Sequence, residues 1–267
     1  MVTLLSIISL GFFLGMRHAT DPDHVIAVST IVSRQPNLAR SARIGVFWGI
    51  GHTLTIFLIG AAIILFNVVI PPRIGLSMEF SVSVMLIVLG AMNVAGFVRT
   101  LPSSQPSLDK TSVVHAHPHS HGDYVHTHAH GHSPEVHPHR PEQTPLARLD
   151  QIFGKLGFYQ SVRPLVIGIV HGLAGSAAVA LLVLTTIRNS YWALAYLLVF
   201  GMGTIAGMML ITLSLASTIR FVAGKRKFSR HLALASGMLS LAFGLVVAYQ
   251  ICVVNGLFTG HPNWTPR

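Results

Sequence analysis

The chain alternates between long apolar stretches and shorter polar connections. A helix needs about 20 predominantly apolar residues to cross a bilayer. Stretches of this kind occur at 3–33, 44–67, 79–100, 164–187, 192–219 and 231–255. Polar residues between Arg17 and His24 interrupt the first of them. The pattern predicts an all-α integral membrane protein with six transmembrane helices.

Composition and charge place the chain in the membrane rather than on nucleic acid. Apolar residues make up 51% and charged residues only 10% of the chain, with a net charge of +10. The excess lies in the connections after the first and fifth stretches, at Arg34, Arg40, Arg43, Arg220, Lys225, Arg226, Lys227 and Arg230, whereas the opposite face holds Arg73 and Arg188. This positive-inside pattern predicts a multi-pass protein of the inner (cytoplasmic) membrane, with both termini outside, lipid as a partner and no nucleic-acid partner.

A polar linker divides the apolar pattern into two halves. Residues 1–100 form the first transmembrane half, 101–162 a histidine-rich linker and 163–267 the second half. Three helices in each half predict opposite insertion of the halves, as in transporters built from inverted repeats. The linker has too few apolar residues for a core, so we expect it to be disordered and, from the charge pattern, cytoplasmic.

Histidine alternates with other residues along much of this linker. Ten of the sixteen histidines lie between His115 and His139. The alternating ones are His115, His117, His119, His121, His126, His128, His130 and His132. Neutral imidazoles at this spacing chelate divalent metals weakly and adaptively. The linker is therefore either an auxiliary metal buffer or sensor, or a polar connection without a metal role.

The interruption of the first apolar stretch is the candidate site. Asp21 and Asp23 are the only acids with membrane-type sequence on both sides, and a carboxylate in hydrocarbon costs about 2.5–3.5 kcal/mol. His18 and His24 flank Asp21, three residues to either side, so helical spacing would place them on one face. Oxygen and imidazole donors together suit Ni²⁺ or Co²⁺. We predict that His18, Asp21, Asp23 and His24 contribute to a metal site.

Pro22 allows two local structures. In a continuous helix it would leave the carbonyl of His18 without a partner and cause a kink. In a broken helix, Asp21 would be the N-cap and Pro22 the first residue of a new helix. Capping alone would explain Asp21 without a metal, but not the two flanking histidines.

Two histidines on other predicted helices extend the candidate site. His24, His52 and His171 each lie eight to ten residues from an arginine at the predicted cytoplasmic face. At 1.5 Å per residue this puts the three imidazoles about 12–15 Å below that face, in one layer. We therefore add His52 as a metal ligand and His171 as a weaker candidate.

Two motifs carry a family resemblance. The run from Arg17 to His24 resembles the signature of the nickel/cobalt transporter (NiCoT) family, and Gly51-His52-Thr53 resembles its Gly-His-Ser/Thr element. Gly168 to Ala178 is similar to the shorter six-helix, urease-accessory-like members of the wider NicO superfamily. The resemblance implies metal recognition by His18, Asp23, His24 and His52, with Asp21 as an additional acid.

We accordingly expect a secondary transporter that carries Ni²⁺ or Co²⁺ into the cytoplasm. The metal would be the substrate, with no permanently bound cofactor. Efflux is one alternative, and an accessory membrane protein that delivers nickel to a metalloenzyme such as urease, with a nickel metallochaperone as partner, is another. We do not expect an enzyme, because His-Glu-x-x-His is absent and Glu79 stands at the start of its predicted helix.

Overall fold

The computed structural model describes residues 4–33, 37–99, 115–121, 124–130, 162–174, 187, 189–222, 226–259 and 261–264. Its helices are α1 (Leu4–His18), α2 (Pro22–Val32), α3 (Leu38–Phe66), α4 (Pro72–Arg99), an unlabelled helix Val162–Ala174, α7 (Ser190–Val222), α8 (Arg226–Tyr249) and the π-helix η2 (Gln250–Val254). Among the described helices, α3, α4, α7 and α8 contain spans long and apolar enough to cross a membrane. The helical membrane class is confirmed, and the count of six spans stays a prediction.

The long helices begin earlier than hydropathy predicts. α3 begins at Leu38 instead of 44, and α4 at Pro72 instead of 79. Charged residues end an apolar window, but they do not end a helix that continues into the polar layer. At α3 the first turn is stabilised further, because the side chain of Asn37 accepts a hydrogen bond from the backbone N–H of Arg40 at 3.1 Å.

The first apolar stretch is a broken helix. α1 ends at His18 and α2 begins at Pro22, with Asp21 at the N-cap. Asp21 has a ψ of 144°, as expected for a residue that precedes proline and avoids the helical region. The broken-helix interpretation is confirmed in position. The capping bond is absent, however, because the Asp21 side chain makes no hydrogen bond to the start of α2.

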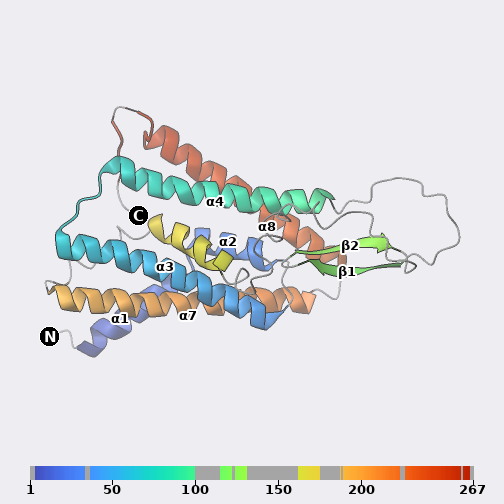
Figure 1. The fold of residues 1–267 in the computed structure, drawn as a ribbon, viewed down its shortest axis with the longest axis horizontal. Coiled ribbons are helices and arrows are strands. Elements are labelled where there is room, and N and C mark those ends of the chain that lie inside the picture. The colour runs from blue at the N-terminus through green and yellow to red at the C-terminus, as the bar shows by residue number, and fades with distance from the viewer. Residues whose placement is uncertain are drawn as a thin grey trace.

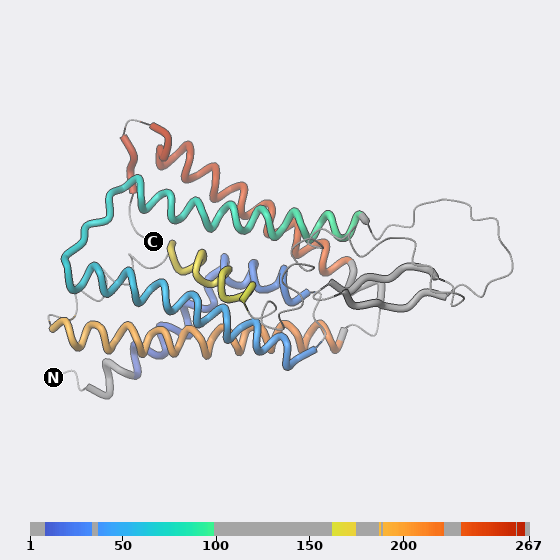
Figure 2. The backbone as a smooth tube through the Cα atoms, in the orientation of Figure 1, coloured from blue at the N-terminus to red at the C-terminus, as the bar shows by residue number. Residues whose placement is uncertain are grey.

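The helices form two sets with α2 between them (Figures 1 and 2). α3 and α1 pack along α7, and α4 packs along α8, whereas α2 contacts α4, α7 and α8. Buried Asn93 of α4 fastens the end of α2, since its Nδ2 donates to Ala233 O at 3.0 Å and reaches Thr30 O at 3.4 Å. This arrangement leaves the beginning of α2 facing the first set of helices.

Glycines allow the helix Val162–Ala174 to approach α3 at backbone distance. A Cβ on Gly51 would collide with the carbonyl of Leu165, and one on Gly168 would collide with the carbonyl of Trp48. Thr55 then bridges the two helices, with Oγ1 donating to Ile169 O at 3.1 Å. The small-residue spacing therefore brings the residues next to Gly51 and Gly168 close together.

The histidine-rich linker contains a hairpin where the sequence predicted disorder. β1 (His115–His121) pairs antiparallel with β2 (Tyr124–His130), and His115, His117 and His119 lie opposite His130, His128 and His126. The alternation that suggested chelation also has the two-residue period of a strand, so register can pair histidine with histidine. The rest of the linker, His132 included, lies outside the described residues.

Candidate metal site

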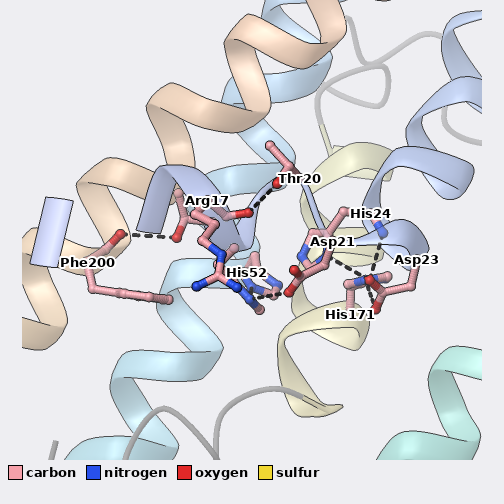
Figure 3. Close-up of polar contacts among 10 residues, drawn as sticks. Arg17, Thr20, Asp21, Asp23, His24, His52, His171 and Phe200 are labelled. Carbon is pink, nitrogen blue, oxygen red and sulfur yellow. Dashed lines mark hydrogen bonds and ion pairs between the residues drawn. The ribbon is translucent and has the colours of Figure 1, made fainter. Parts of the chain in front are cut away.

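Four histidines from four segments meet at the break between α1 and α2, and Figure 3 labels three of them, His24, His52 and His171. His18 ends α1, His24 lies in the first turn of α2, His52 is on α3 and His171 on the helix Val162–Ala174. The ring centroid of His24 lies 4.2 Å from that of His171 and 4.8 Å from that of His52. The ring centroids of His18 and His52 are 5.2 Å apart. The structure therefore brings the predicted layer of imidazoles together.

Asp23 links two of these rings. Its Oδ1 accepts the backbone N–H of His24 at 2.9 Å and lies 3.1 Å from His24 Nδ1. Its Oδ2 lies 3.0 Å from His171 Nε2. One carboxylate thus contacts imidazoles from two different helices and helps to orient both rings.

Asp21 orients the remaining part of the cluster. Its Oδ2 lies 2.8 Å from His18 Nδ1, while His18 Nε2 lies 3.0 Å from His52 Nε2. Donation from Nδ1 to the carboxylate leaves a lone pair on Nε2 of His18, the atom that faces His52. This contact explains why Asp21 makes no helix cap, and it places the carboxylate of Asp21 where it can orient the ring of His18.

Burial makes the cluster chemically unusual. The side chains of His24, His52 and His171 are at most 2% exposed, whereas that of Asp23 is 32% exposed. His24 Nε2, His52 Nδ1 and His171 Nδ1 are buried without a hydrogen-bond partner in the part of the chain that the structure describes. Unpaired polar atoms in such positions are costly. A divalent cation is the natural partner for ring nitrogens in this setting.

The donors form two overlapping groups. His18, His24 and His52 make one group, and Asp23, His24 and His171 make the other; within each group one ligand atom per residue lies within 4.8 Å of the others. His24 belongs to both. Imidazole and carboxylate donors suit Ni²⁺ and Co²⁺, so either group offers three ligands to such an ion and leaves its other positions to water.

The structure brings the six site residues that were predicted outside the linker to one place. His18, Asp21, Asp23, His24, His52 and His171 all line one cavity of about 260 Å³. His171, the weaker candidate, is as buried as His52 and contacts Asp23 directly. Metal binding by any of these residues stays a prediction.

Sequence reasoning set aside a further acid that lines the cavity. Glu79 lies there with Gln250 and Asn255. The predicted helix began at 79, which made Glu79 look like an interfacial residue, but α4 begins at Pro72. Glu79 is therefore about two turns inside the helix. The scarcity of acids could have drawn attention to Glu79, since the chain has only eight acidic residues.

In the motif Gly51-His52-Thr53, each residue makes a contact that explains its presence. Gly51 admits the neighbouring helix, His52 enters the cluster, and Thr53 Oγ1 donates to Gly201 O of α7 at 3.1 Å. A Cβ on Gly201 would collide with Thr53 in turn. The motif therefore packs α3 against both the helix Val162–Ala174 and α7. These contacts fix the position of His52 along the helix axis.

Comparisons with known proteins agree with this chemistry. Residues 4–253 match the family model described as NicO, high-affinity nickel-transport protein. The chain is also 39% identical over 259 residues, covering 96% of both chains, to the urease accessory protein UreH of Bacillus sp. (strain TB-90). No solved structure matches it.

Proposed function

Since the chain belongs to the NicO family of high-affinity nickel-transport proteins, we propose that it carries Ni²⁺ or Co²⁺ across the inner membrane into the cytoplasm, by secondary transport. The family is one of transport proteins rather than enzymes. The observation that carries the proposal is the buried cluster of four imidazoles and Asp23 at a break in a membrane helix. Broken helices supply substrate sites in many secondary transporters.

His18, Asp23, His24 and His52, with His171, bind the ion in this proposal. His24 is common to both three-residue groups, so the ion moves from one group to the other without losing all its protein ligands at once. Asp21 holds the ring of His18 through the 2.8 Å contact. The charge of Asp23 offsets that of the cation, and the metal is cargo rather than a resident cofactor.

The two halves, 1–100 and 163–267, are inverted repeats of three transmembrane helices each, joined by the linker 101–162. The contacts support this, because α3 packs along α7 and α4 along α8. α1 contacts α7, and in the corresponding place the helix Val162–Ala174 contacts α3. The chain directions in Figure 1 also agree, since α3 and α7 run oppositely, as do α4 and α8. A two-fold axis in the membrane plane would produce this pattern.

Both termini lie outside and the linker is cytoplasmic. The beginning of α1 and the end of α8 support this placement, because they lie at the same end of the helices (Figure 1). The arginines near the start of α3 and the end of α7, at the opposite end, then follow the positive-inside pattern. Histidines that stand opposite one another in β1 and β2 would collect ions there and pass them to a nickel metallochaperone.

Uptake of radiolabelled nickel tests the proposal. Cells expressing the wild type should accumulate nickel above empty-vector cells, and His24→Ala should abolish the excess. His231→Ala is the matched control, since His231 lies on α8, where its ring contacts Phe97, and it should leave uptake unchanged. Accumulation below the empty-vector level would mean efflux. Equal accumulation, with folded protein confirmed in the membrane, would contradict nickel transport.

The likeness to a urease accessory protein favours a second candidate function. In this alternative the chain receives nickel at the same cluster and delivers it to a metalloenzyme without moving it across the bilayer. Purified protein in liposomes separates the two. Nickel flux into the vesicles supports transport, whereas tight nickel binding without flux supports delivery.

A further inference from the structure

The cavity that reaches the histidine cluster has a second polar region. Beyond the histidines and the two aspartates it is lined by Glu79 of α4, by Gln250 at the start of η2 and by Asn255 just after its end. Apolar side chains, with Leu86 and Phe243 among them, make up much of the remaining wall. The two polar regions thus belong to one space of about 260 Å³.

The position of Glu79 calls for an explanation. α4 begins at Pro72, which puts Glu79 about 10 Å along the helix, where its side chain is half-buried. An ionisable residue inside a membrane helix is costly and marks a functional site by default. Among the described residues, Asp21, Asp23 and Glu79 are the acids of the helical region, and all of them line this cavity.

The backbone beside Glu79 is also specialised. α8 passes into the π-helix η2, in which the N–H of Asn255 donates to the carbonyl of Gln250 at 2.9 Å. Single π turns concentrate at functional sites, because the extra residue redirects the side chains around it. Here Gln250, which begins the π turn, and Asn255, which follows it, both line the cavity.

Trp264 covers Glu79 from the segment that follows η2. Its Nε1 donates to Glu79 Oε1 at 2.8 Å, and its ring lies against Gly75, where any side chain would collide with it. The N–H of Asn263 donates to Asn255 O at 3.0 Å and holds the segment in place. An indole needs only a neutral acceptor, so this bond by itself gives no reason for a carboxylate.

We propose that Glu79, with the side-chain oxygens of Gln250 and Asn255, is a second cation site that receives a partly hydrated divalent ion and that Trp264 closes. The inference rests on the proposed function in one respect, that the ion crosses through this cavity. Oxygen ligands suit Mg²⁺ and Mn²⁺ as well as nickel, whereas imidazoles discriminate strongly in favour of Ni²⁺ and Co²⁺. The Glu79 site therefore admits divalent ions, and the histidine cluster selects among them.

Binding of Mn²⁺ to the purified full-length protein, followed by electron paramagnetic resonance, tests this without transport. Wild type and His24→Ala should bind Mn²⁺, and Glu79→Gln should bind it at least tenfold more weakly. Glu79→Gln should still bind Ni²⁺ at the cluster, and His24→Ala should not. Glutamine keeps an acceptor for Trp264, so an unchanged melting temperature will show that the fold survives.

Equal Mn²⁺ affinity in wild type and Glu79→Gln, or no Mn²⁺ binding by the wild type, would overturn the proposal. Either result would leave nickel uptake intact as a separate finding, and a failure of uptake would leave Mn²⁺ binding interpretable. Trp264→Phe keeps a ring on Gly75 but removes the N–H. It should raise Mn²⁺ affinity by up to about tenfold, because the indole no longer competes for Oε1. An unchanged affinity would contradict closure by Trp264.

Discussion

The histidine cluster and the histidine hairpin use the same side chain in opposite ways. In the cluster, His18, His24, His52 and His171 come from segments far apart in sequence, and two carboxylates orient the rings. In β1 and β2 the histidines are neighbours in sequence, paired by register, and neither strand contains an acid. Under the proposed function, the carboxylates that orient the buried rings would make the cluster the selective site, whatever the number of imidazoles in the hairpin.

The largest effect should follow from removing one buried ring. His52→Ala should lower nickel affinity by more than about 100-fold, because it removes a fully buried ligand from the group formed by His18, His24 and His52. Equilibrium dialysis of the purified protein with radiolabelled nickel measures this. His231→Ala is the control, and if both variants bound nickel equally well the cluster would not be the site.

Neutralising Asp23 should come next. Asp23→Asn keeps the shape of the side chain but removes the charge that faces His24 and His171, so nickel affinity should fall by about 10–100-fold. The same dialysis measures it. A loss smaller than that of Asp21→Asn would reverse the roles given to the two aspartates.

Asp21→Asn should have a moderate effect. The amide can still contact His18, but it no longer favours the Nδ1–H tautomer so strongly, and affinity should fall by about tenfold. Because Asp21 makes no capping bond to α2, the melting temperature should change little. A large drop in melting temperature with unchanged nickel affinity would mean that Asp21 is structural.

The smallest effect should come from the hairpin. His117 and His128 stand opposite each other in β1 and β2, and the double substitution of both by alanine removes one such pair. Nickel affinity at the cluster should stay within about twofold, as expected for sites that share no residues. A loss as large as that of His52→Ala would show that the two regions work as one site.

The family resemblance and the break in the first apolar stretch could both be predicted from local sequence. The resemblance to nickel transporters is confirmed by the family match over residues 4–253, and the break at Pro22 follows from the effect of proline on the residue before it. Asp21 shows the limit. Its position at the N-cap was predictable, but the direction of its side chain depends on His18, which competes with the backbone of α2 for the carboxylate.

Features that depend on helix ends and on packing could not be read from hydropathy. Glu79 looked interfacial because the apolar window begins only at 79, after Arg73 and its polar neighbours. The helix itself begins earlier, at Pro72. His171 lies in the cluster because Gly51 and Gly168 allow backbone contact between its helix and α3. A single glycine is a weak signal in a membrane helix, and only the fold shows which pair of glycines meets.

The position of α2 between the two sets of helices has a mechanical consequence. His18, His52 and His171 belong to the set around α7, whereas the far end of α2 is tied to α4 and α8 through Asn93. Under the proposed function, an ion held by His24 and by these histidines would therefore link the two sets of helices. Its departure would remove that link, so the transported ion itself would determine when the two sets could rotate against each other.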